Sequence, residues 1–154
     1  MIVKEQATRE EKSVFLDRSA LAAFMDSTHP LHQKAVHFFF GLDDLQQPLI
    51  TLNLTIYEMH EWLRNQVGFQ QAHFFLNVIK RAEQAKVLTI IPIDDAIEQE
   101  ALNLMLEHPE YEFTYLEACT FTVIHELGVY RIFSLDPNVK RIAQAWPEVQ
   151  IVPT

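Results

Sequence analysis

The sequence has little cysteine and no long apolar run. Cys119 is the only cysteine among 154 residues, which excludes an internal disulfide and makes a reducing compartment the expected setting. No apolar stretch approaches the roughly 18 residues of a transmembrane helix. Residues 1–12 are polar and charged and lack the apolar run of a signal peptide. We therefore expect a cytoplasmic protein that does not bind membranes.

Basic residues are also scarce. The chain has 12 Lys and Arg against 21 Asp and Glu, which gives a formal net charge of −9. Proteins that bind nucleic acid non-specifically through a broad surface usually have the opposite balance. That mode of binding is therefore disfavoured. A site at which bound divalent cations supply the positive charge remains open.

Glycine is rare as well, with 3 residues against 7 prolines, which excludes a low-complexity chain. The apolar fraction of 49% and the length are those of one globular domain with a substantial core. We predict a polar N-terminal leader at residues 1–12 and a single domain at residues 13–154.

Short apolar runs alternate with amphipathic segments along the chain. Strands are predicted at 13–17, 48–52, 87–93, 130–135 and 148–152. Helices are predicted at 19–26, from 31 to the 41–47 region, and at 53–67, 69–85, 94–107 and 114–128. This order predicts an α/β fold, a three-layer α/β/α domain with a mostly parallel central sheet.

Four acidic residues occupy equivalent places in this pattern. Asp17 and Asp136 follow the first and fourth predicted strands, and Glu58 and Glu117 lie near the starts of predicted helices. In a parallel sheet, strand carboxyl ends and the starts of the following helices meet at one edge. The four side chains are therefore expected to converge on one crevice.

Clustered carboxylates repel one another and cannot all stay ionised without a counter-charge. Mg²⁺ and Mn²⁺ prefer oxygen ligands and would supply that charge. A carboxylate site with such an ion is suited to the hydrolysis of phosphodiesters. The four acids are therefore candidates both for metal binding and for catalysis.

These segments resemble the PIN-domain nucleases, including the VapC-like toxins of bacterial toxin–antitoxin pairs. The resemblance covers nearly the whole chain after residue 12. The matching segments are 14–21, 29–35, 48–58, 113–120 and 132–136. It implies a PIN-like fold and an endoribonuclease that depends on Mg²⁺ or Mn²⁺ and hydrolyses RNA phosphodiester bonds. It also implies, as partners, an RNA substrate, an antitoxin protein and a second copy of the chain.

Two residues depart from the family pattern. Glu117 stands where the family usually has aspartate, and Arg18 stands where a small hydroxyl residue is common. The alternative function is therefore a PIN-fold binding or regulatory module with a weak or inactive site. A third possibility is another α/β enzyme that handles phosphate. A phosphatase of the haloacid dehalogenase type would need a second aspartate at position 19, where the chain has Ser19.

Each candidate acid also has a purely structural interpretation. Asp17 could be an ordinary helix cap, and Glu58 a solvated helix residue. Thr114 and Glu117 have the spacing of a capping box, in which the glutamate returns to the cap amide. Asp136 precedes a proline and could be a turn residue.

Residues around the acids are assigned supporting roles. Ser19 is expected to hydrogen-bond Asp17 or to cap a helix. Thr120 lies one turn after Glu117 and either lines the site or is tucked into its helix. The candidate substrate-binding residues are Arg18, Arg64 and Lys140, for which surface ion pairs are the alternative.

Overall fold

Five parallel strands form one sheet in the computed structural model, which describes residues 13–44 and 48–153. The predicted leader at 1–12 lies outside the described residues. The strands are β1 (Val14–Leu16), β2 (Leu49–Leu52), β3 (Leu88–Ile91), β4 (Arg131–Phe133) and β5 (Gln150–Val152). Their order is β3-β2-β1-β4-β5, and every pairing is parallel. The predicted parallel sheet is confirmed.

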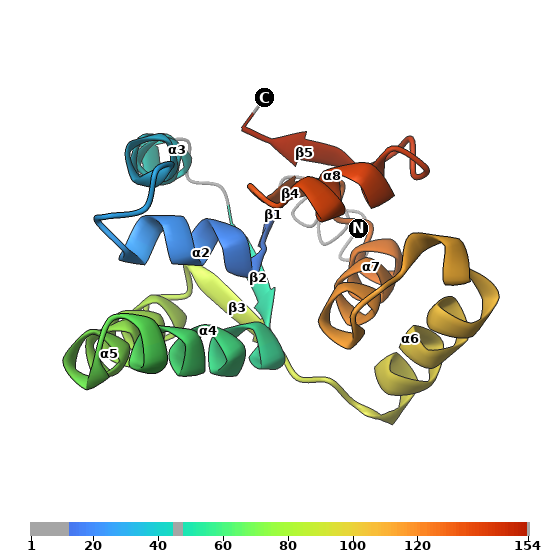
Figure 1. Ribbon diagram of the computed structural model, residues 1–154, viewed down its shortest axis with the longest axis horizontal. Coiled ribbons are helices and arrows are strands. Elements are labelled where there is room, and N and C mark those ends of the chain that lie inside the picture. The colour runs from blue at the N-terminus through green and yellow to red at the C-terminus, as the bar shows by residue number, and fades with distance from the viewer. Residues whose placement is uncertain (1–12, 45–47, 154) are drawn as a thin grey trace, which may run out of the picture.

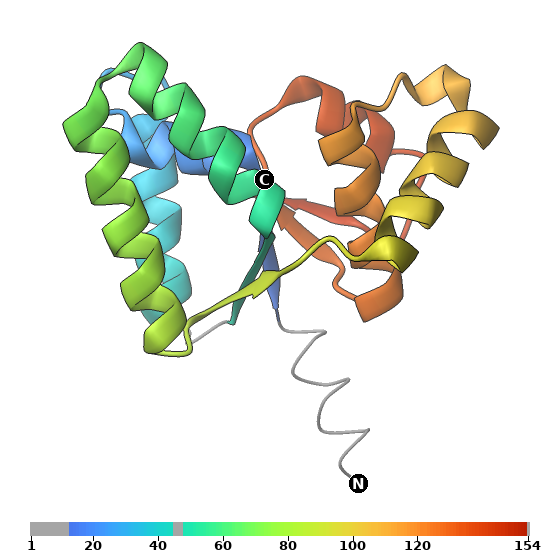
Figure 2. The ribbon, with the colours of Figure 1, turned by 90° about the horizontal axis from the view of Figure 1, so that it is seen from below.

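Helices cover both faces of this sheet (Figure 1). One layer contains α2 (Arg18–Met25), α3 (His32–Asp44), α4 (Asn53–Gln66) and α5 (Phe69–Gln84). The other contains α6 (Asp95–Glu107), α7 (Tyr115–Leu127) and α8 (Pro137–Ala143), with a 3-10 turn, η1, at Pro109–Tyr111. Figure 2 shows the two layers on opposite sides of the strands. The three-layer α/β/α architecture is the one that the sequence predicts.

The period-2 alternation of strand side chains divides the interior into two cores. Val14 and Leu16 of β1 pack with α2–α5, whereas Phe15 packs with α6–α8. In β4, Phe133 joins the first core and Ile132 joins the second. All three residues of β1 are buried, as expected for a central parallel strand with helices on both faces.

Side-chain caps and a glycine mark several helix boundaries. Asp94 caps α6 by accepting a hydrogen bond from the Ile97 amide, and Thr114 caps α7 in the same way. Gly128 ends α7 with φ 66°, a left-handed conformation that glycine adopts at no steric cost. Asn53 does not cap α4. It is the first residue of the helix, and its Oδ1 accepts from the amides of Leu54 and Ile93.

The segment after β4 differs most from the sequence expectation. β4 ends at Phe133, so Asp136 follows the strand after two further residues. Asp136 then caps α8, a helix that was not expected from the sequence pattern. Among the described helices, none is both long and apolar enough to span a membrane.

Candidate active site

Asp17, Glu58, Glu117 and Asp136 line one cavity of about 210 Å³. They reach it from four different elements. Asp17 directly follows β1, Glu58 lies on α4, Glu117 lies in the first turn of α7, and Asp136 immediately precedes α8. The structure therefore brings together the four acids that the sequence pattern singles out.

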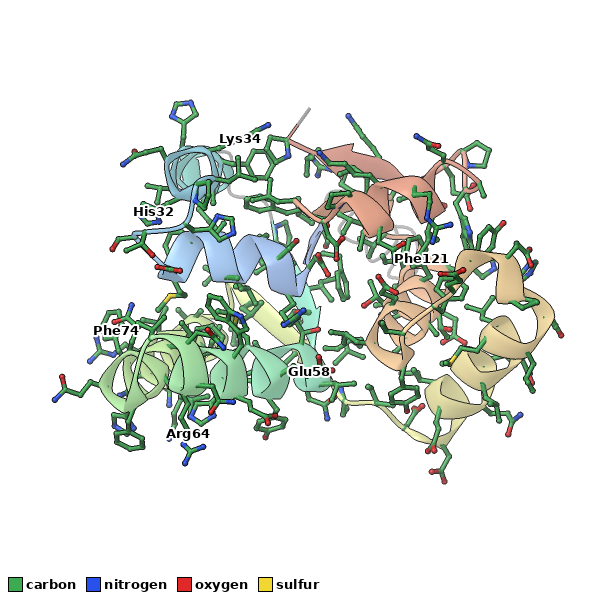
Figure 3. The ribbon with its side chains drawn as sticks, viewed as in Figure 1. His32, Lys34, Glu58, Arg64, Phe74 and Phe121 are labelled. Atoms are coloured by element: carbon green, nitrogen blue, oxygen red, sulfur yellow. The ribbon has the colours of Figure 1, made fainter. Side chains whose placement is uncertain are left out.

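Helix N-termini explain why the fold can gather these acids. Asp17 and Asp136 are the N-cap residues of α2 and α8, and Glu117 is the third residue of α7. The positive end of a helix dipole stabilises a nearby negative charge. This offsets part of the repulsion between the carboxylates. Figure 3 shows Glu58 in the N-terminal half of α4, near the centre of the molecule.

Two serine hydroxyls hold Asp17. Ser19 Oγ donates to Asp17 Oδ2 at 2.6 Å, and Ser134 Oγ donates to the same oxygen at 2.8 Å. The Asp17 carboxylate makes no capping hydrogen bond to α2, although the residue occupies the N-cap position. The expected hydrogen bond from the Ser19 hydroxyl is confirmed.

The same serines tie the end of β1 to the segment after β4. Ser19 Oγ accepts from the Leu135 amide at 2.9 Å, and Ser134 Oγ accepts from the Asp136 amide at 3.1 Å. Ser134 is completely buried. The two hydroxyls therefore fix the backbone that carries Asp136 relative to the Asp17 carboxyl group.

Burial raises the pKa of Asp17 above the usual value for aspartate. The side chain is only 8% exposed, and loss of hydration disfavours its charged form. The hydroxyls of Ser19 and Ser134 act in the opposite direction, and the nearby charge of Asp136 raises the pKa further. Burial and the nearby acid therefore both disfavour the ionised form of Asp17.

Glu117 takes part in a complete capping box. Its Oε1 accepts from the Thr114 amide at 2.8 Å, while Thr114 Oγ1 accepts from the Glu117 amide at 3.1 Å. Its second oxygen, Oε2, accepts from Asn138 Nδ2 at 2.8 Å. The structural alternative for Glu117 is thus realised, and both carboxylate oxygens have protein donors.

Asn138 connects two of the acids and was not found from the sequence. The backbone amide of Asn138 donates to Asp136 Oδ1 at 2.9 Å, and its side-chain Nδ2 donates to Glu117 Oε2. Arg141 holds Asn138 Oδ1 through Nη2 at 2.7 Å. Aspartate followed by proline is a helix-start signal, with Pro137 at the first position of α8. That signal would have placed Asn138 beside Asp136 on a helix.

Three other predicted residues lie outside this cavity. Thr120 is buried, and its hydroxyl donates to the Leu116 carbonyl within α7, so the proposed role at the rim is corrected. Arg64 and Lys140 are exposed and do not line the cavity, whereas Arg18 does. In Figure 3, Arg64 lies farther along α4, apart from Glu58.

The donor set matches the chemistry of a hard divalent cation, which prefers carboxylate oxygens. Within residues 13–44 and 48–153, no three Asp, Glu, His or Cys side chains are grouped closely enough to hold an ion as they stand. Instead, the carboxylates of Asp17, Asp136 and Glu117 accept hydrogen bonds from other groups of the protein. An ion would replace part of this hydrogen bonding, and Glu58 is the acid for which the structure shows no such bond.

Solved structures with the same architecture include proteins from two bacteria. Mycobacterium tuberculosis VapC20, described as a sarcin–ricin loop cleaving toxin, matches with a TM-score of 0.69 and 21% identity over 84% of this chain and 94% of that chain. FitAcB from Neisseria gonorrhoeae matches with a TM-score of 0.63 and 10% identity over 91% of this chain and 96% of that chain. No protein-family model and no curated protein sequence matches the chain. At these identities the likeness concerns the fold, and the chain has a VapC-like PIN-domain fold.

Proposed function

We propose that the chain is a metal-dependent endoribonuclease that hydrolyses RNA phosphodiester bonds. The observation that carries the proposal is the position of Asp17, Glu58, Glu117 and Asp136, which line one cavity from four separate elements. A fold needs no such gathering of like charges for stability, and the raised pKa of Asp17 reflects its burial and the nearby charge of Asp136. The likeness to VapC20, a sarcin–ricin loop cleaving toxin, supports RNA as the substrate.

In this proposal, Mg²⁺ or Mn²⁺ would be held by Asp17, Glu58 and Asp136. Glu117 lines the same cavity. A bound ion of this kind would supply a hydroxide nucleophile and charge stabilisation for the leaving oxygen. Ser19 and Ser134 fix the orientation of Asp17, since both donate to its Oδ2. The cation would also offset part of the negative charge at the site, in a chain whose net charge of −9 otherwise repels RNA.

A toxin role with an antitoxin protein as partner, and a homodimer, belong to the same proposal. The VapC-like fold supports them. Exposed aromatic rings on α5 also support protein contacts, because Phe69 is 65% exposed and Phe74 is 56% exposed. Figure 3 shows Phe74 on the outer surface of the layer that contains α5.

A PIN-fold binding module is the second candidate. It is favoured by Glu117, whose two oxygens already accept hydrogen bonds from Thr114 and Asn138. Such a module would bind RNA or protein at this site without cutting it.

Cleavage of a labelled RNA pool separates the two candidates. The parent chain should cut RNA when Mn²⁺ or Mg²⁺ is present and should stop when EDTA is added. Asp17→Asn should abolish cutting while the protein stays folded, because asparagine keeps the size of the side chain but removes the charge that would hold the ion. Asp95→Asn is the matched control, since Asp95 is exposed on α6 and lies outside the cavity. A folded parent without cation-dependent cleavage would favour the binding module.

A further inference from the structure

The face of α4 that brings Glu58 to the cavity continues as a polar stripe. Glu61, Trp62, Asn65 and Gln66 follow Glu58 at spacings that place all five on one side of a helix. Together with Arg18, these residues line an open groove of about 480 Å³. The groove shares Arg18 and Glu58 with the cavity that contains the acids, so the two hollows adjoin each other.

Trp62 gives this groove an aromatic wall of fixed position. The side chain is partly buried and packs against the core formed by α2–α5, yet it also lines the groove. Asn65, Gln66 and Glu61 are exposed beside it and offer amide donors, amide acceptors and a carboxylate. An aromatic face beside polar side chains is the arrangement that recognises unpaired bases, by stacking and by hydrogen bonds to the base edge.

The charges in the groove indicate which part of a nucleic acid would lie there. Arg18 is the one cation among its lining residues, against Glu58 and Glu61. A track for several phosphates would need the opposite balance. Arg18 lies where the groove meets the cavity. It can therefore contact the one phosphate that links the nucleotide in the groove to the nucleotide at the cleaved bond. An amphipathic protein segment would need an apolar floor, and Trp62 is the one apolar side chain in the lining.

We propose that this groove is a subsite for one unpaired nucleotide next to the cleaved bond. The base stacks on Trp62, its edge contacts Glu61, Asn65 and Gln66, and Arg18 contacts the linking phosphate. The Glu61 carboxylate accepts hydrogen bonds only, so it favours a base with an amino group. Uracil has no amino group and can offer only its N3–H, so it is the RNA base with the fewest hydrogens to donate to Glu61. The assignment rests on the proposed function, because that function defines the bond beside which the nucleotide lies.

Binding is tested with a fluorescent, randomised single-stranded RNA pentanucleotide and the full chain carrying Asp17→Asn, which should not cut the RNA. Trp62→Ala should weaken binding by about five- to a hundredfold, the range for loss of stacking on one base. Tyr57→Ala is the matched control, since Tyr57 is an exposed aromatic residue on α4 outside the groove. It should leave the affinity unchanged.

Tryptophan fluorescence gives a second readout. The chain has two tryptophans, so Trp146→Phe leaves Trp62 as the reporter. Pentanucleotide RNA should quench this variant, and the quenching should be absent from Trp62→Phe. Equal quenching in both variants, or equal affinities of the Trp62→Ala and Tyr57→Ala proteins, would overturn the subsite. If Trp62→Ala fails to fold, Asn65→Ala replaces it in the affinity test. Asn65 is exposed in the groove, and its loss should also weaken RNA binding.

Cleavage mapping on randomised RNA keeps this proposal separate from the nuclease proposal. The parent should discriminate against uracil at one position beside the cut, and Glu61→Gln should relax that discrimination, because glutamine can also donate. Cleavage with no base preference at flanking positions would leave the nuclease standing and remove the subsite. RNA binding that depends on Trp62, in a chain that cuts no RNA, would support the groove and remove the nuclease.

Discussion

At the scale of single residues, Asp17 is a carboxyl group that the fold buries beside a second acid. Its pKa is raised by burial and by Asp136, although the hydroxyls of Ser19 and Ser134 partly compensate. The folded state therefore binds the Asp17 proton more tightly than the unfolded state does. Stability from this residue is fully present below the unfolded pKa of about 3.9 and is lost as pH rises through the folded pKa.

The stability of Asp17→Asn should therefore depend on pH in a particular way. Asparagine does not ionise, so the melting temperature of the variant should rise relative to that of the parent between pH 4 and neutral pH in EDTA. Asp26→Asn should show the opposite trend, because hydrogen bonds from Thr28 lower the pKa of Asp26. Its cost should be greatest at neutral pH and should shrink as pH falls. A difference between Asp17→Asn and the parent that does not change with pH would contradict the account.

Both carboxylate oxygens of Glu117 already accept hydrogen bonds within the protein, from Thr114 and Asn138. Glu117→Gln keeps an oxygen for the Thr114 amide, so the capping box can still close. We expect this variant to cut RNA at the parental rate and to lose at most about 1 kcal/mol of stability. Thr114→Ala should cost about the same by removing the capping hydroxyl, with cleavage unchanged. A stable Glu117→Gln protein that no longer cuts RNA would place Glu117 among the metal ligands.

The candidate site could be predicted from the sequence only in part. The four acids and the hydrogen bond from Ser19 to Asp17 follow from positions close to strand ends and helix starts. Ser134 could not be paired with Asp17 by sequence distance, because 117 positions separate them. Of the two roles left open for Thr120, the structure shows the one inside the helix, because a threonine hydroxyl on a buried helix face can bond the carbonyl four residues earlier.

At the scale of elements, the strands were the most predictable part of the fold. The apolar runs of β1, β2 and β4 are largely buried on both faces, so nearly every residue of these strands contributes to the apolar signal. Helix α8 was missed because it is short, with 7 residues, and because Asp136 and Pro137 also fit a turn. Packing of Val139 and Ile142 against the second core supports a helix that local signals leave ambiguous.

The end of α7 offers a test at this scale. Gly128 has φ 66°, and an added Cβ would lie 3.6 Å from the Tyr130 hydroxyl, so conformation rather than space is the obstacle. Gly128→Ala should lower stability by about 1–2 kcal/mol, as expected for a left-handed residue. Gly41→Ala is the control, because Gly41 lies within α3 with no atom within 4 Å of the added carbon. It should raise stability by about 0.5–1 kcal/mol in urea unfolding. Equal effects at both positions would contradict the assigned helix end.

At the scale of the whole molecule, the cavity lies where the two helix layers meet the carboxyl edge of the sheet. Asp17 and Glu58 come from the layer of α2–α5, whereas Glu117 and Asp136 come from the side of α7 and α8. The sheet therefore fixes the acids of one layer relative to those of the other. A cation at this place would join the two layers and should stabilise the folded chain, because it would bind that state alone.

The most direct measurement is a crystal structure of the full chain grown with Mn²⁺, with anomalous scattering recorded to locate the ion. The account predicts a peak in the cavity, with oxygens of Asp17 and at least one of Glu58 and Asp136 within about 2–2.3 Å. The same experiment on Asp17→Asn should show the peak lost or much reduced. A parent crystal whose only Mn²⁺ peaks lie away from this cavity, or whose peak is unchanged by Asp17→Asn, would contradict the proposed metal site.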